Sequence, residues 1–157
     1  DVPVIDSFEP LRDIYSISQA MYKNNLEELT ELLNLSELLK TPARQLSLGQ
    51  RMRCEIAASL LHSPSILFLD EPTIGLDAVS KLAVRDFIKQ LNQDHKTTVI
   101  LTTHDMQDIE ALTNRILLIG KGRILMDGSP EELKQDATSM DEAVVKLYRS
   151  FDENEGR

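Results

Sequence analysis

A short apolar run that ends in two acidic residues constrains the fold of this chain more than any other feature. The run covers residues 66–69, and Asp70 and Glu71 follow it directly. An apolar run of this length, bounded by polar residues, predicts a buried β-strand. In open α/β sheets, ligands bind at the carboxyl ends of the strands. The pattern therefore predicts a sheet that carries two carboxylates at a ligand-binding edge.

The sequence around this run alternates between helical and strand patterns. One amphipathic helix is predicted over about residues 50–61, and a second over about residues 78–92. The β-branched residues of segment 97–102 then predict another strand. This alternation predicts an α/β fold with a mostly parallel sheet flanked by helices.

The last third of the chain predicts a hairpin and a helix. Residues 116–119 and 123–126 flank Gly120, Lys121 and Gly122, which is typical of a tight turn between two strands. A capping box from Ser129 to Glu132 predicts the start of a helix. From about Ser150 the chain is polar and acidic, and we expect it to fray there.

The first forty residues predict a small helical region. Segment 7–40 has helical periodicity, and Ser18 and Ser36 are suitable N-caps for successive helices. One apolar stripe has helical spacing and consists of Tyr22, Leu26, Leu29 and Leu33.

Composition excludes several classes of function. The 17 Lys and Arg residues face 26 Asp and Glu residues, and the resulting net charge of −9 would repel a nucleic-acid backbone. The single cysteine, Cys54, cannot form an intrachain disulfide or a cysteine-based metal site, which favours a reducing, cytoplasmic compartment. The longest apolar runs are far shorter than the ~20 residues of a membrane helix. We therefore expect any membrane contact to be made through a partner.

Four short segments carry residues suited to phosphate chemistry. Asp70 could hold Mg²⁺ and Glu71 could orient an attacking water, although both could equally begin an ordinary turn at Pro72. Ser47 begins a helix whose free N–H groups suit an anion, or is a plain N-cap. His104 follows the second strand and could donate a hydrogen bond to a phosphate oxygen, or could be an ordinary surface residue.

The fourth segment, residues 75–77, ends in Asp77, which could equally be a turn residue that caps the next helix. In this order and spacing the four segments resemble the ATP-binding-cassette (ABC) ATPase family. Residues 46–50 look like its signature, 67–71 like its Walker B strand, and 75–77 like its D-loop, while His104 looks like its switch histidine. The likeness extends over about residues 1–135, and Leu48 stands where the family usually has glycine.

This resemblance implies a role for each residue. In the family, two ATPase domains close head to tail around ATP. The residues that the resemblance implies contact ATP held by the partner domain are Ser47, Gly49 and Gln50. Asp70 would support Mg²⁺, and Glu71 would be the general base or position the water. Asp77 would cross the dimer interface, and His104 would contact the γ-phosphate.

The resemblance also implies a domain organisation. Residues 1–45 would be a helical subdomain, residues 46–135 a catalytic α/β half, and residues 136–157 a carboxyl-terminal helix with a frayed acidic tail. The phosphate-binding loop with its glycines and lysine is absent from the sequence. We therefore expect these residues to be inactive alone, as a fragment of a P-loop NTPase-like fold.

Two classes of function remain open at this point. The first is an ATPase subunit that energises membrane transport, with export favoured because residues 2–15 look like those of bacterial exporters. Its partners would be a second ATPase domain and a membrane-spanning permease, which would hold it at the cytoplasmic face of the plasma membrane. The alternative is a soluble ABC-class ATPase that moves no solute. A degenerate cassette that only scaffolds is disfavoured by Asp70, Glu71 and His104.

Overall fold

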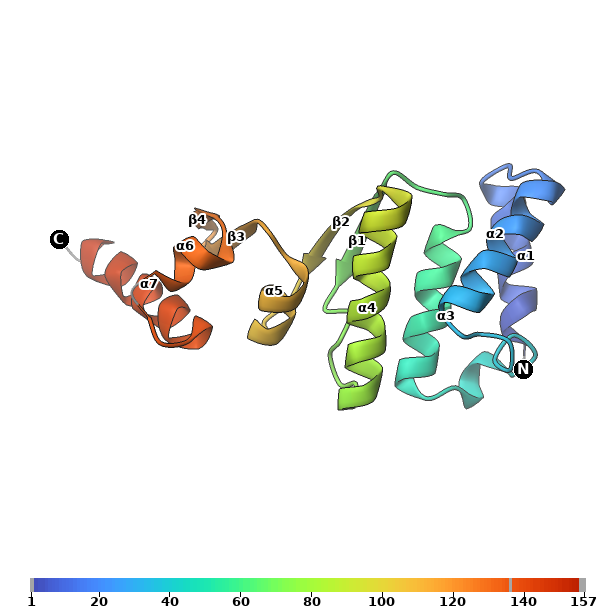
Figure 1. Cartoon of the computed structure of the whole chain (residues 1–157), viewed down its shortest axis with the longest axis horizontal. Coiled ribbons are helices and arrows are strands. Elements are labelled where there is room, and N and C mark those ends of the chain that lie inside the picture. The colour runs from blue at the N-terminus through green and yellow to red at the C-terminus, as the bar shows by residue number, and fades with distance from the viewer. Residues whose placement is uncertain (1, 136, 156–157) are drawn as a thin grey trace. The chain divides into compact units, whose positions relative to one another are not determined.

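The computed structural model describes all residues except 1, 136 and 156–157. It also does not describe the side chains of residues 95 and 152–155. The chain divides into two compact units, Asp1–Thr102 and Thr103–Arg157. The first unit contains helices α1 to α4 with strands β1 and β2, and the second contains α5 to α7 with β3 and β4 (Figure 1). Both units combine helices with a small sheet, so the predicted α/β class is confirmed.

Three helices open the first unit. They are α1 (Val4–Ile14), α2 (Gln19–Leu32) and α3 (Leu48–Leu60). The Ser18 side chain accepts a hydrogen bond from the Met21 N–H, which confirms Ser18 as the N-cap of α2. In the predicted stripe, Tyr22, Leu29 and Leu33 are buried and Leu26 is half-buried. The stripe faces the interior because α2 packs against α3.

The predicted helix after Ser36 is wrong. Residues 35–41 form hydrogen-bonded turns, in which the Leu38 N–H donates to the Leu35 carbonyl at 2.7 Å. Pro42 disfavours helical geometry in the residue before it, so only a few residues could have propagated a helix. A short 3-10 turn, Ala43–Gln45, then leads into α3.

A βαβ unit completes the first unit. Strand β1 (Ile66–Asp70) is followed by α4 (Ala78–His95) and then by β2 (Thr98–Thr102), and β1 pairs with β2 in parallel. Helix α4 packs against β2 and buries four apolar side chains at helical spacing, as predicted. They are Val84, Phe87, Ile88 and Leu91.

One face of this parallel pair is apolar and exposed. Phe68 is 72% exposed, and Ile66 and Ile100 are about half exposed. Leu67, on the opposite face, is buried. Side chains alternate along a strand, so the two faces differ residue by residue. Within the described residues the first unit thus covers its parallel sheet on one side only.

The second unit begins with α5 (Met106–Leu112) and continues into the predicted hairpin. Strands β3 (Ile116–Gly120) and β4 (Arg123–Gly128) are antiparallel. Lys121 and Gly122 form the turn, and both have positive φ (50° and 74°), as a two-residue hairpin turn of this hand requires.

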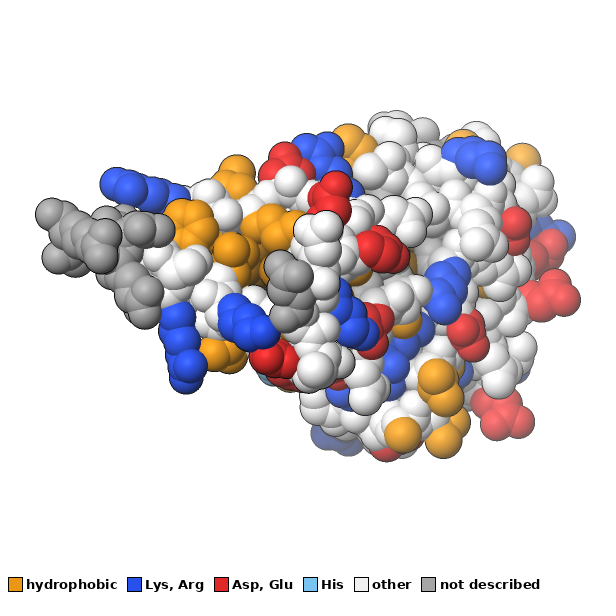
Figure 2. All heavy atoms as spheres, turned by 60° about the vertical axis from the view of Figure 1, so that its left-hand side comes forward, with side chains coloured by type: hydrophobic (Ala, Val, Ile, Leu, Met, Phe, Trp, Pro, Cys, Tyr) orange, Lys and Arg blue, Asp and Glu red, His pale blue; other side chains and the backbone are white. Residues whose placement is uncertain are grey.

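Two helices pack on this hairpin. They are α6 (Pro130–Lys134), which begins with the predicted Ser129–Glu132 capping box, and α7 (Met140–Glu155). A small core forms around Leu133, Met140 and Ala143. Figure 2 shows hydrophobic side chains that remain at the surface of this unit. Helix α7 extends past Ser150, where fraying is predicted, to residue 155; residues 156–157 lie outside the described part, and the fraying stays a prediction.

The first turn of α7 is held by Glu142. Its carboxylate accepts hydrogen bonds from the Thr138 N–H (2.9 Å) and hydroxyl (2.6 Å) and pairs with Lys146 at 2.8 Å. These hydrogen bonds lower the pKa of Glu142 from 4.5 to about 2. The bond from Lys146 has the largest effect, followed by those from Thr138. A carboxyl with a lowered folded-state pKa stabilises the fold above its unfolded pKa, and this stabilisation is lost as pH falls through the folded value.

We predict that Glu142→Gln reduces the thermal stability of the chain near neutral pH and that the difference from wild type shrinks between pH 4.5 and 2. Thermal unfolding followed by circular dichroism at several pH values measures this. Asp141→Asn is the matched control, because the Asp141 carboxylate takes no part in these bonds. An unfolding-temperature difference between wild type and Glu142→Gln that stays constant down to pH 2 would contradict the prediction.

Candidate functional site

The register of the parallel pair determines what lies at its carboxyl edge. Asp70, the last residue of β1, is aligned with Thr102, the last residue of β2. The Thr102 hydroxyl donates a hydrogen bond to the Asp70 carboxylate. Parallel strands end at the same edge of a sheet, so Asp70 and Glu71 lie where an open α/β sheet binds its ligand. Both strands are visible beside α4 in Figure 1.

Glu71 leaves the strand in an unusual conformation. Its φ is 47°, in the left-handed region that costs a non-glycine residue energy. Its N–H donates to the Thr102 carbonyl at 3.1 Å and to the Thr102 hydroxyl at 3.2 Å. The side chain of Glu71 is half-buried, and that of Asp70 is exposed. The chain then turns through buried Pro72 and Thr73.

Ser47 and Gln50 cap α3 reciprocally. The Ser47 hydroxyl accepts from the Gln50 N–H at 3.2 Å, and the Gln50 side-chain oxygen accepts from the Ser47 N–H at 2.9 Å. These bonds use neither the hydroxyl proton of Ser47 nor the side-chain NH₂ of Gln50. The N–H groups of Leu48 and Gly49 lie in the first turn, where the helix itself provides no acceptor. The start of α3 therefore presents several donors to an anion.

The starts of α3 and α4 are in direct contact. A β-carbon placed on Gly49 would lie 2.8 Å from the Ser80 Oγ, and one placed on Gly75 would lie 3.0 Å from a methyl carbon of Leu48. Gly75 also has φ +69°. Glycine at both positions lets the two helix starts approach closely. The structure therefore joins segments 46–50 and 75–77 in one place.

Asp77 is the N-cap of α4. Its carboxylate accepts from the N–H groups of Val79 and Ser80 at 3.0 Å each and from the Ser80 hydroxyl at 2.7 Å. The Ser80 hydroxyl bond, followed by the Ser80 backbone bond, lowers the pKa of Asp77. The capping alternative is thus correct for Asp77 as a structural description. It leaves the implied role across a dimer interface as a prediction.

His104 lies two residues beyond Thr102 and is exposed. It precedes Asp105, the N-cap of α5, whose side chain accepts from the Gln107 N–H at 3.0 Å. Because His104 belongs to the second unit, its implied contact with the γ-phosphate stays a prediction.

The donor set at the strand edge fits Mg²⁺ only as an ion shared with a nucleotide. Among the described residues, no cluster of three or more His, Cys, Asp or Glu side chains could hold a metal ion. Magnesium is commonly bound through one or two carboxylates, with water and substrate phosphates supplying the other ligands. Asp70 is an exposed carboxylate of this kind, and its Oδ1 accepts only the Thr102 hydroxyl within the described part.

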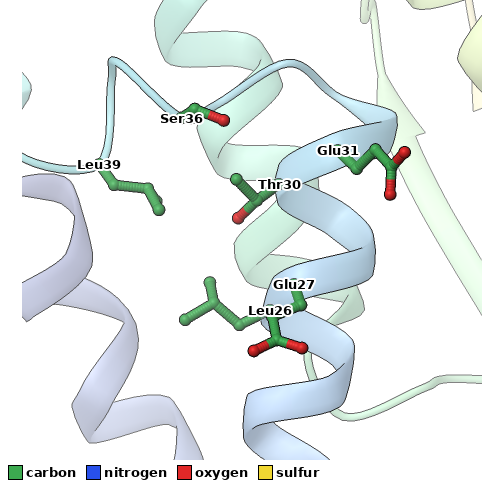
Figure 3. Close-up of a pocket in the computed structure, with 6 residues that line it drawn as sticks. All are labelled: Leu26, Glu27, Thr30, Glu31, Ser36 and Leu39. Carbon is green, nitrogen blue, oxygen red and sulfur yellow. The ribbon is translucent and has the colours of Figure 1, made fainter.

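A separate pocket lies in the helical part of the first unit. Figure 3 shows its lining side chains on α2 and on the turns that follow. They are Leu26, Glu27, Thr30, Glu31, Ser36 and Leu39. None of the predicted site residues lines this pocket, so it does not belong to the candidate site.

Two contributors to the site were not predicted as site residues. Thr102 is hydrogen-bonded to both Asp70 and Glu71. Ser80 lies close to Gly49 and donates a hydrogen bond to Asp77. Thr102 was visible in the sequence as a hydroxyl at the end of the second strand. Ser80 gave no comparable signal, because serine three residues after an N-cap is common on helix surfaces.

Comparison with known proteins finds similarity to ATP-binding proteins of transporters. A family model described as "ABC transporter" matches residues 2–74. The energy-coupling factor transporter ATP-binding protein EcfA3 of Oenococcus oeni is 34% identical over 88% of this chain and 48% of its own length. The Nod factor export ATP-binding protein I of Cupriavidus metallidurans is 32% identical over 94% of the chain and 48% of its own length.

A third relative and a solved structure extend the comparison. The glucose import ATP-binding protein GlcV of Saccharolobus solfataricus is 31% identical over 99% of the chain and 44% of its own length. The chain therefore spans about half the length of these relatives. A solved ATP-binding subunit of an ABC transporter superposes with a TM-score of 0.78 over 94% of this chain and 63% of its own, at 23% identity, which shows the shared fold.

We predict that Gly49→Ala destabilises the chain by about 1–3 kcal/mol, the usual cost of forcing an extra carbon into a packed site. The added carbon would press on Ser80 and disturb its bond to Asp77. Urea denaturation of wild type, Gly49→Ala, Ser80→Ala and the double variant measures this. If the clash is with Ser80, the double variant should be more stable than the sum of the single losses predicts. Strict additivity would contradict this prediction.

Proposed function

Because this chain belongs to the ABC transporter ATPase family, we propose that it is part of an ATPase subunit that couples ATP hydrolysis to transport across a membrane. The longer protein that would contain it is called the parent protein below. The observation that carries the proposal is the parallel β1–β2 register, which sets Asp70 opposite Thr102 and puts Glu71 at the same edge.

The two carboxylates at this edge suit different tasks. Asp70 is exposed and would support Mg²⁺, which supplies charge neutralisation to the phosphates of bound ATP. Glu71 is half-buried and would orient the attacking water or accept its proton. His104 would donate a hydrogen bond to the γ-phosphate from the loop after β2. These roles divide phosphoryl transfer between ion binding, water positioning and charge stabilisation.

The joined starts of α3 and α4 would form the other half-site. Ser47, Gly49 and Gln50 would bind the phosphates of ATP held by a second ATPase domain, using the donors that the capping box leaves unused. Asp77 would lie at the interface between the two domains. A head-to-tail dimer is therefore the proposed working form.

The proposed second partner is a membrane-spanning permease. No helix in the part of the chain that the structure describes is long and apolar enough to cross a membrane. The permease would hold the subunit at the cytoplasmic face of the plasma membrane. Export remains the proposed direction from the resemblance of residues 2–15 to exporters. One relative is named for export and another for import, so the names of relatives favour neither direction.

A soluble ABC-class ATPase is the alternative within the same family. The net charge of −9 gives such a protein little means to hold nucleic acid. Co-purification of the parent protein with a membrane-spanning subunit distinguishes the two possibilities.

In the parent protein, Glu71→Gln should leave ATP binding intact and slow hydrolysis by about a hundredfold or more, the scale of losing a general base. The shape of the side chain is kept and its basicity is lost. Equilibrium ATP binding and steady-state phosphate release measure the two effects. The variant should also accumulate as an ATP-bound dimer on size exclusion.

Two further variants sharpen this test. Asp70→Asn should instead weaken the Mg²⁺ dependence of binding and activity, and Glu55→Gln on the exposed side of α3 is the control for loss of a carboxylate. Hydrolysis by Glu71→Gln at the wild-type rate would show that another group orients the water.

The 157-residue chain alone should show no steady-state ATPase activity and at most weak ATP affinity, because it lacks a phosphate-binding loop. Isothermal titration calorimetry with MgATP and a phosphate-release assay test this. Micromolar ATP binding by these residues would mean that the nucleotide is held elsewhere than proposed.

A further inference from the structure

Thr102 is hydrogen-bonded to both carboxylate-bearing residues of the strand edge. Its hydroxyl donates to Asp70 Oδ1 and accepts from the Glu71 N–H at 3.2 Å. A hydroxyl has one proton to give and two lone pairs to receive, whereas a carboxylate only accepts and an N–H only donates. The direction of both bonds is therefore fixed by chemistry, and the hydroxyl bridges two residues that are adjacent in sequence.

The backbone of Thr102 adds a third contact. Its carbonyl accepts from the Glu71 N–H at 3.1 Å, so this N–H is shared between the carbonyl and the hydroxyl of one residue. Glu71 has a left-handed conformation (φ 47°). Such a conformation costs energy and persists only where neighbouring contacts stabilise it. Thr102 thus contacts Asp70 through its side chain and the strained Glu71 through its side chain and backbone.

We propose that Thr102 is a positioning residue whose hydroxyl orients the Asp70 carboxylate and stabilises the conformation of Glu71. This inference rests on the proposed ATPase function and adds a residue to it. The Asp70 oxygen that bonds to the hydroxyl is held in place, and the other oxygen is thereby directed for an ion. Loss of the hydroxyl removes one of the two acceptors that the Glu71 N–H shares on Thr102.

A purely structural role for Thr102 and a positioning role predict opposite rankings of the valine and serine variants. Threonine is β-branched and favours strands, so a purely structural residue would be replaced well by valine and less well by serine. A positioning hydroxyl would be replaced well by serine and poorly by valine. Thr102→Val and Thr102→Ser therefore separate the two roles by their order.

The experiment uses the parent protein with ATP and Mg²⁺ as probes. Steady-state assays give kcat and KM for MgATP, and a Mg²⁺ titration of ATP binding is made in the Glu71→Gln background so that turnover cannot affect it. Thr102→Val should lower kcat by about tenfold or more, the scale of one hydrogen bond to a charged group, and should raise the Mg²⁺ concentration needed for half-maximal binding. Thr102→Ser should stay within about threefold of wild type.

A double variant tests whether Thr102 acts through Asp70. If it does, Thr102→Val should shift the Mg²⁺ dependence of ATP binding in the Glu71→Gln background when Asp70 is kept, but should add little when Asp70→Asn is also present. Thermal unfolding midpoints confirm that the compared variants are folded, and Thr102→Ala replaces Thr102→Val if the latter does not fold.

Each outcome decides the proposal. Valine equal to wild type, or valine better than serine, overturns the positioning role. Equal impairment of both variants overturns the role of the hydroxyl. A wild-type parent protein that shows no Mg²⁺-dependent ATP binding or hydrolysis would refute the proposed function itself, which is distinguishable because the wild type and not the variant fails.

Discussion

The parallel pairing of β1 with β2 is the interaction on which the candidate site depends. Side chains alternate between the faces of a strand, so a slip of one residue would move every side chain of β2 to the opposite face. Asp70 would then no longer face the Thr102 hydroxyl, and the Glu71 N–H would lose its shared acceptors. Helix α4 stabilises the observed register by covering the face that contains Leu67.

Within the described residues, the β1–β2 sheet lacks cover on one of its two faces. Parallel sheets are normally covered on both faces, because their strands are apolar on both sides. Phe68, Ile66 and Ile100 expose apolar surface on the second face, at a free-energy cost proportional to the area in contact with water. The edge that carries Asp70 and Glu71 thus belongs to a sheet that, among the described residues, is covered on one face only.

The sequence predicted the elements well where a local pattern decides them. Helical periodicity located α2 and α4, hydroxyl N-caps located the starts of α2, α3 and α6, and the Lys121–Gly122 turn located the hairpin. The helix after Ser36 failed because an N-cap is only a start signal, and Pro42 stops the segment too soon. Periodicity also could not show that α7 passes Ser150, where the polar sequence predicted fraying.

The contacts within the site required information that no local pattern holds. Thr102 and Asp70 are 32 residues apart, and only the register of two strands makes them partners. The contact between Gly49 and Ser80 likewise depends on how two helix starts pack. A sequence can indicate that each segment carries suitable chemistry, but the hydrogen bonds between segments follow from packing, which is non-local.

Two adjacent carboxylates can perform different tasks only if their surroundings differ. Asp70 ends a regular strand, is exposed, and accepts a hydrogen bond from the Thr102 hydroxyl. Glu71 is half-buried and is turned away from strand geometry by its left-handed backbone, which ends the regular alternation of side chains. The Thr102 hydroxyl contributes to both environments, since it donates to one residue and accepts from the other. A single hydroxyl can therefore contribute to the different surroundings that the proposed ion-binding and water-positioning roles require.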